Sequence, residues 1–313
     1  MTDRISTTVP MPGTAESSVA ERLPVLALLA LAMTAFLALL SETLPAGLLP
    51  QIARDLNISE VMTGQLVTVY AIGSILTAIP LTALTSGWRR RNVLLLAIIG
   101  FLIFNTATAL APNYMVALAS RFVTGMAAGL AWGLMAGYAR RMVSVEQQGR
   151  AMAIAMIGTP LALSLGVPLG TLMGGVLGWR SIFGIMSGLA VVLVAWVLLV
   201  VPDYPGQKRG ERLSIRQVFV TPGVRPILFV IVAWMLAHNI LYTYIAPFLA
   251  PSGLRPRVDL VLLVYGVGSL AGIWLVSQLI DRWLRPLVLG CIAAFALVMV
   301  ALGLAMDSPI VIY

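Results

Sequence analysis

The sequence predicts an all-α membrane protein built of helical bundles, and three observations support this prediction. Of the 313 residues, 60% are hydrophobic and only 10% are charged, whereas soluble domains carry about a quarter charged residues. The apolar runs are long enough to cross a hydrocarbon layer of about 30 Å, which takes roughly 20 helical residues. The runs also lack the alternating pattern of a membrane β-barrel, so each crossing is expected to be a helix.

Nine apolar runs follow one another along the chain, separated by polar or turn-forming residues. They cover residues 24–49, 61–84, 92–111, 115–138, 151–176, 180–201, 226–249, 259–280 and 286–306. A tenth run begins in the final SPIVIY. We expect each of the nine complete runs to form one membrane-spanning helix.

Polar stretches divide the chain into four parts. Residues 1–22 are rich in Ser and Thr and are predicted to be a disordered tail. Residues 23–201 are expected to form a bundle of six spans. Residues 202–225 are polar, basic and bounded by Pro and Gly, as is typical of a linker. Residues 226–313 are expected to form an incomplete second bundle. No cleaved signal peptide is expected, because the first apolar run is longer than a signal core.

The basic residues indicate the orientation of the spans. With a cytoplasmic N-terminus, the inner segments hold fifteen of the 20 Lys and Arg residues, and the outer segments hold four. The inner fifteen are Arg4, Arg22, Arg89, Arg90, Arg91, Arg140, Arg141, Arg150, Lys208, Arg209, Arg212, Arg216, Arg225, Arg282 and Arg285. This bias predicts a multi-pass protein of the cytoplasmic (inner) membrane with a cytoplasmic linker. It also accounts for the net charge of +8 without a nucleic-acid partner.

Cysteine and histidine are almost absent from the sequence. Cys291 is the single cysteine and His238 the single histidine. An intrachain disulfide therefore cannot form, and a metal site of clustered His and Cys ligands is not expected. No enzyme active site and no cofactor site can be recognised, so the function is expected to depend on the spans and the surrounding lipid bilayer.

Apart from tyrosines, only Glu42, Arg121 and His238 are ionisable groups well inside the spans. Such groups are expensive to bury in lipid and are functional hypotheses by default. Glu42, in LALLSETLPAGLLP, is predicted to exchange protons or to contact a substrate. The alternative is an interfacial residue that caps the Pro45 region. Arg121 cannot readily lose its charge and is predicted to couple protonation to movement. Its alternative role is to pin one helix to the backbone carbonyls of another.

Weaker signals come from small and aromatic residues. Glycines recur at every fourth position of span four, from Gly125 to Gly137, and predict close contact with another helix. Pro168 in span five removes a backbone donor and predicts a bend. The candidate walls of a substrate cavity are Tyr70, Trp132, His238, Tyr242 and Tyr244. Each of these is, taken alone, as often or more often a packing residue.

Several segments resemble the major facilitator superfamily, and within it the twelve-span drug–proton antiporter group. SETLPAGLLPQIARDL resembles the acidic and proline-containing segment that ends span one in that group. RFVTGMAAG matches the Arg-x-x-x-Gly motif of span four, and so associates Arg121 and Gly125 with proton coupling. GVPLGTLMGGVLGWRSIF, with Gly166, Pro168 and Gly170, resembles the antiporter segment of span five. YTYIAPFL resembles the seventh span.

The loop after span two departs from the family pattern Gly-x-x-x-Asp-Arg-x-Gly-Arg-Arg. In LTALTSGWRR, Leu81 and Thr85 replace the glycine and the aspartate. The corresponding loop after span eight, SQLIDRWLR, is closer to the pattern, and this repetition supports two homologous halves. The candidate gating residues of the two loops are Arg89, Arg90, Asp281, Arg282 and Arg285.

The resemblance implies a transporter that works by alternating access. The function it favours is efflux of a small molecule (a drug, sugar or nucleoside) in exchange for protons. Two alternatives remain open: a proton-coupled uptake permease, and a truncated protein that does not transport. The second arises because the family has twelve spans and nine complete spans are present here.

Overall fold

The computed structural model describes residues 23–207, 215–243 and 258–304, and nearly all of them are helical. The helices of the first six spans are α1 (Val25–Gly47), α3 (Glu60–Leu84), α4 (Arg90–Ala109), α5 (Tyr114–Arg141), α6 (Gln148–Met156) with α7 (Gly158–Leu161) and α8 (Val167–Leu177), and α9 (Trp179–Val200). The remaining helices are α2 (Leu49–Leu56), α10 (Ile215–Val220), α11 (Val224–Thr243) and α13 (Val258–Leu304). No strand occurs in these ranges, and the all-α prediction is confirmed.

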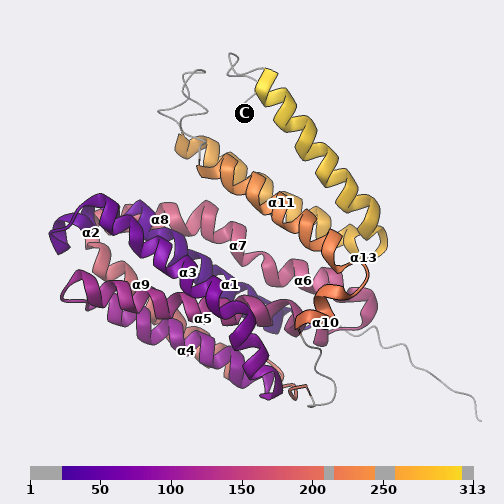
Figure 1. Cartoon of the computed structure of the whole chain (residues 1–313), viewed down its shortest axis with the longest axis horizontal. Helices are drawn as coiled ribbons and strands as arrows, with labels where there is room; N and C mark the ends of the chain where they lie inside the picture. Colours follow the sequence, from indigo (N-terminus) through magenta and orange to yellow (C-terminus); the bar gives the residue numbers. More distant parts are fainter. Residues whose placement is uncertain (1–22, 208–214, 244–257, 305–313) are drawn as a thin grey trace, which may run out of the picture.

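Seven helical segments of the described chain are long and apolar enough to cross a membrane. Six of them match the predicted spans one to six. The seventh predicted span begins as α11, whose described part ends at Thr243. Predicted spans eight and nine are joined in α13, which has non-helical dihedral angles at Trp283 (φ −125°, ψ 29°). Pro286 follows three residues later and removes a backbone donor. In Figure 1 the yellow half of α13 runs back from this kink.

Two membrane helices begin at side-chain caps. The hydroxyl of Ser59 accepts a hydrogen bond from the backbone N–H of Met62 at the start of α3 (3.2 Å). The side chain of Asn113 accepts one from the N–H of Val116 at the start of α5 (3.0 Å). Both satisfy an N–H that has no partner within its own helix. The caps therefore define where two spans begin.

The glycines of α5 allow it to lie very close to α3. A side chain at Gly125 would collide with the backbone carbonyl of Tyr70, and one at Gly129 with the backbone of α3 at Ser74. A side chain at Gly133 would meet the hydroxyl of Thr82. The predicted close contact is therefore confirmed for these three positions. At Gly137 the helices have separated, because an added Cβ would have no neighbour within 4 Å.

Span five is interrupted by a π-helical turn, Ala162–Gly166, directly before Pro168. Proline cannot donate a backbone hydrogen bond, and a π turn is one way for a helix to accommodate that loss. On either side of this turn the segment packs on α1. Gly158 lies against the backbone of Ala32, Gly166 against the ring of Phe36 and Gly170 against Leu44. The sequence predicts a bend at Pro168, and the structure has a change of helical type just before it.

A polar cluster ties α2 to α9 at the end of the bundle predicted to be extracytoplasmic. The carboxylate of Asp55 accepts hydrogen bonds from the indole of Trp179 (3.1 Å) and from Nε of Arg180 (3.0 Å). Arg180 also donates to the backbone carbonyl of Ala111 (2.7 Å). Trp179 and Arg180 therefore connect α9 to α2 at this end of the bundle.

The second part of the chain contacts the first mainly through the first half of α13, which packs on α6, α7 and the π turn. Gly266 lies against the side chain of Ser164. In Figure 1, α11 and the yellow half of α13 extend away from the six-span bundle. Spans five and eight thus form the junction between the two parts.

Candidate functional site

Arg121 lies at the centre of the six-span bundle and has no exposed surface. Nε of its guanidinium donates to the backbone carbonyl of Leu66 in α3 (3.3 Å), and Nη2 donates to the backbone carbonyl of Glu42 in α1 (3.4 Å). The guanidinium carbon is 4.5 Å from the ring centroid of Tyr70 and 5.8 Å from that of Phe183. A single cation thus joins helices α1, α3, α5 and α9.

One nitrogen of this guanidinium, Nη1, is buried without a hydrogen-bond partner. An unsatisfied buried donor on a charged group is energetically costly. The carbonyl contacts agree with the pinning role that was the alternative for Arg121. A purely structural role for Arg121 would not require Nη1 to lack a hydrogen-bond partner.

Glu42 is half-buried, in the last part of α1, three residues before the buried Pro45. Its backbone carbonyl, and not its carboxylate, receives the hydrogen bond from Arg121. The two charged residues are therefore neighbours across the α1–α5 contact without a direct ion pair. This arrangement places the carboxylate of Glu42 near the charge of Arg121.

A second polar contact next to Glu42 was not anticipated from the sequence. The amide of Asn105 in α4 donates to the hydroxyl of Ser41 (3.0 Å), and both side chains are fully buried. The amide oxygen of Asn105 has no partner. An Asn inside an apolar run was a signal available in the sequence, since such residues are often interhelical contacts.

The predicted cavity walls have different surroundings. Tyr70 is fully buried, lies under Arg121, and donates from its hydroxyl to the carbonyl of Ala38 (2.6 Å). It is thus part of the bundle core. Trp132 is half-buried and packs against that core. The side chains of His238 and Tyr242 lie outside the described residues, as does the whole of Tyr244.

The loop after span two is fastened by the start of the linker. The carboxylate of Asp203 pairs with Arg89 and accepts from the backbone N–H of Arg91 (3.2 Å). Burial alone would raise the pKa of Asp203, but these hydrogen bonds and the two arginine charges lower the pKa below its ordinary value. The backbone N–H of Arg90 donates to the carbonyl of Tyr204 (2.9 Å). Asp203 was missed because the linker is distant in sequence.

The loop after span eight contacts span five directly. The carboxylate of Asp281 accepts from the backbone N–H groups of Gly149 (2.6 Å) and Arg150 (3.1 Å), at the start of α6. A carboxylate is favoured there by the helix dipole and the unpaired N–H groups. The other two gating candidates of this loop, Arg282 and Arg285, are exposed. Asp281 is therefore the residue of this loop that bridges the two parts of the chain.

Comparison with known proteins adds to this geometry. The sequence pattern of the Major Facilitator Superfamily matches residues 31–313. The chain belongs to the major facilitator superfamily. Members of this family are transporters and not enzymes, so the resemblance inferred from the motifs is confirmed.

Relatives in sequence include efflux proteins. The chain is 32% identical over 282 residues to a chloramphenicol efflux pump of Mycobacterium tuberculosis (strain ATCC 25618 / H37Rv), covering 85% of this chain and 67% of the relative. It is 30% identical over 261 residues to an uncharacterized MFS-type transporter of Bacillus subtilis (strain 168), covering 83% and 67%. A probable sugar efflux transporter of Helicobacter pylori (strain HPAG1) is 28% identical over 272 residues, covering 86% and 68%.

Solved structures support the fold of this family member. A proton:xylose symporter bound to 6-bromo-6-deoxy-D-glucose superposes with a TM-score of 0.60 at 15% identity, covering 83% of this chain and 70% of the other. The human organic anion transporter MFSD10 superposes with a TM-score of 0.55 at 16% identity, covering 84% and 73%. At these identities the likeness concerns the fold alone.

Proposed function

We propose that the protein exports a small molecule across the cytoplasmic membrane in exchange for protons, by alternating access. The N-terminus and the 202–225 linker lie in the cytoplasm in this proposal, in agreement with the charge bias. The family membership supports transport, and relatives that are efflux pumps favour export.

The observation that carries the proposal is the fully buried Arg121 beside Glu42. When the Glu42 carboxylate is charged, it and the guanidinium attract each other across the α1–α5 contact. When the carboxylate takes up a proton this attraction is lost, while Arg121 keeps its charge and its carbonyl contacts. Proton uptake and release would therefore change the preferred spacing of α1 and α5. That is the requirement for coupling a proton to helix movement.

The contact of Asp281 with the start of α6 supplies a gate in this proposal. It joins span eight to span five at the end predicted to be cytoplasmic, so that end cannot open while both hydrogen bonds persist. The contact involves few groups and an exposed carboxylate, so its breaking is energetically accessible, on the order of 1 kcal/mol. The rigid six-span bundle could then rock against the second part.

Chloramphenicol is the substrate we propose to test first, because the efflux pump of Mycobacterium tuberculosis that exports it is 32% identical to this chain. Everted membrane vesicles containing the chain are energised so that their lumen becomes acidic. We expect radiolabelled chloramphenicol to accumulate in the lumen and to leave when nigericin removes the pH gradient. Accumulation that ignores nigericin would contradict proton coupling, and accumulation only in right-side-out vesicles would favour uptake instead.

A further inference from the structure

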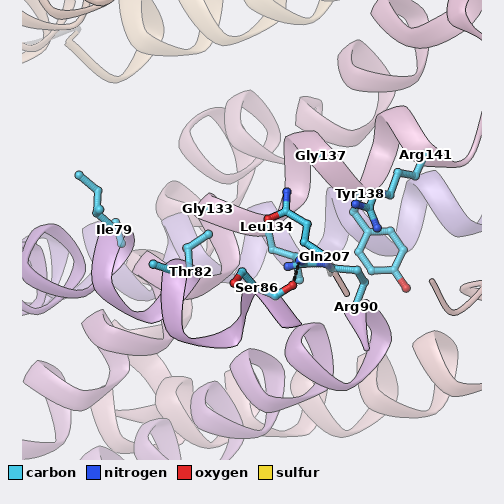
Figure 2. A pocket seen from close by; sticks show the side chains of 12 residues that line it. Ile79, Thr82, Ser86, Arg90, Gly133, Leu134, Gly137, Tyr138, Arg141 and Gln207 are labelled. Atoms are coloured by element: carbon cyan, nitrogen blue, oxygen red, sulfur yellow. Dashed lines mark hydrogen bonds between the residues drawn. The ribbon is translucent and has the colours of Figure 1, made fainter. Parts of the chain in front are cut away.

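A second site lies away from Glu42 and Arg121, at the end of the bundle that carries the basic loops. A cavity of about 590 Å³ opens between α3 and α5, and Gln207 of the linker forms part of its wall (Figure 2). It exists because α3 and α5 separate beyond Gly133, after the close contact made by the earlier glycines. The proposed transport mechanism does not use this cavity.

One end of the cavity is basic and polar. Arg90 is 8% exposed, and its guanidinium donates to the carbonyl of Ser86. Arg141 donates from Nη1 to the carbonyl of Pro205 (3.0 Å). Both of these contacts are to backbone carbonyls. None of the twelve lining residues is Asp or Glu, and Asp203 is engaged with Arg89 outside the lining.

Ser86 provides an independent sign that a ligand belongs here. Its side chain is 8% exposed, and its hydroxyl has no hydrogen-bond partner although it lines the cavity. The hydroxyl of Thr82, also in the lining, is buried and without a partner as well. A buried donor without a partner is unfavourable, and a bound oxygen-rich group would provide the missing acceptor.

The other end of the cavity is apolar. Ala78, Ile79 and Leu134 line it, and Ile79 is 58% exposed on α3. Figure 2 shows Ile79 far from Arg141, with Thr82 and Ser86 between them. The lining therefore changes from charged to apolar along its length. An ion of phosphate size would leave the apolar end unfilled.

We propose that this cavity binds an anionic phospholipid of the inner leaflet. The phosphate group lies between Arg90 and Arg141 and accepts a hydrogen bond from the hydroxyl of Ser86, because guanidinium groups match phosphate oxygens in charge and geometry. The acyl chain passes over Ile79 toward the bilayer. A net anionic headgroup is favoured over a zwitterionic one by the local excess of positive charge.

The test measures binding of dioctanoyl-phosphatidylglycerol to the purified full chain, with dioctanoyl-phosphatidylcholine and inorganic phosphate as comparison ligands. We expect phosphatidylglycerol to bind with the lowest dissociation constant. Arg141→Gln is expected to weaken it about tenfold and Ser86→Ala about threefold, as for loss of a charged and a neutral hydrogen bond. Arg140→Gln is the matched control, because Arg140 bonds to Gln148 (2.7 Å) outside the cavity. It should bind within about twofold of the wild type.

Three results would overturn the proposal. Equal weakening by Arg140→Gln and Arg141→Gln would indicate attraction to surface charge in general. Equal binding of both lipids would remove the anionic headgroup from the assignment. Inorganic phosphate that binds as tightly as the lipid, with the same dependence on Arg141, would assign the site to a soluble phosphate instead. The unfolding temperature of each variant shows whether it is folded. If Arg141→Gln does not fold, the binding measurement on Ser86→Ala tests the proposal.

Discussion

At the scale of single residues, Arg121 is the buried charge around which the candidate site is arranged. It is a permanent cation with no exposed surface, held by two carbonyls and the face of Tyr70. Such a group destabilises the bundle unless its contacts are kept, so its surroundings are constrained on four helices. Arg121 also lies beside Glu42, the carboxylate that we propose to exchange protons.

Substitution of Arg121 is the first prediction. Arg121→Ala should reduce proton-driven chloramphenicol transport in vesicles to below about a tenth of the wild-type rate, while the protein remains in the membrane. Arg121→Lys should restore only part of the rate, since a lysine ammonium cannot bridge two carbonyls as a planar guanidinium does. Undiminished transport by Arg121→Ala would leave this residue a structural one.

Glu42→Gln is the second prediction. The substitution keeps the shape of the side chain and removes its titration, so the pH dependence of transport should become flat. Transport of chloramphenicol is compared with that of a cationic compound across an imposed pH gradient. Selective loss of the cationic compound with an unchanged pH profile would assign Glu42 to substrate contact. No change in either measurement would make it an interfacial residue.

At the scale of secondary-structure elements, the glycines of α5 allow α3 and α5 to approach each other closely. Their spacing of four places them along one face of α5, and α3 lies against that face. The same contact positions Tyr70 under Arg121. Loss of this contact would therefore affect both stability and the candidate site.

The third prediction compares two glycines of the same helix. Gly125→Ala should lower the unfolding temperature in detergent, with a cost of about 1–3 kcal/mol, because the new methyl group meets the backbone of Tyr70. Gly137→Ala should have no such cost, since an added Cβ there has no neighbour within 4 Å. Equal effects of the two substitutions would mean that helix propensity, and not the α3–α5 contact, governs stability here.

The linker contact gives the fourth prediction. Because the folded-state pKa of Asp203 is below its ordinary value, its contribution to stability is present above the unfolded pKa of about 3.9 and is lost as pH falls through the folded pKa. Asp203→Asn should therefore cost up to about 1 kcal/mol at pH 7, limited by the exposure of Arg89. In thermal unfolding, the difference from wild type should shrink as the pH falls below about 3.9 and disappear once the pH is below the folded-state pKa. A difference that persists there would point to lost packing instead of lost charge.

At the scale of the whole molecule, two parts of unequal size meet through spans five and eight. The six-span part has a continuous core between α1, α4, α5 and α9. Among the described residues, the second part contacts it through residues that include Asp281 and Gly266. In the proposed mechanism, movement between the two parts would occur at this junction.

The orientation of the molecule gives the fifth prediction. A cysteine at Arg209, introduced together with Cys291→Ser, should react with an impermeant maleimide only after the cytoplasmic face is exposed. Residue 209 belongs to the segments predicted to face the cytoplasm, and those segments hold most of the Lys and Arg residues. A second cysteine at Asp55, beside the opposite end of the bundle, should react in intact cells. Labelling of the Arg209 position in intact cells would reverse the topology.

The number and order of the first six spans, the family and the position of Arg121 inside a span could all be derived from the sequence. These features depend on local hydrophobicity and short motifs. An arginine inside an apolar run can be recognised from the sequence without knowing which way its side chain points. The partners of each polar residue could not be derived in this way. Arg121 reaches Leu66 and Glu42, Asn105 reaches Ser41, and Arg89 reaches Asp203. Pairings between residues so distant in sequence depend on how each helix is rotated and where it crosses its neighbours, which only the tertiary packing determines.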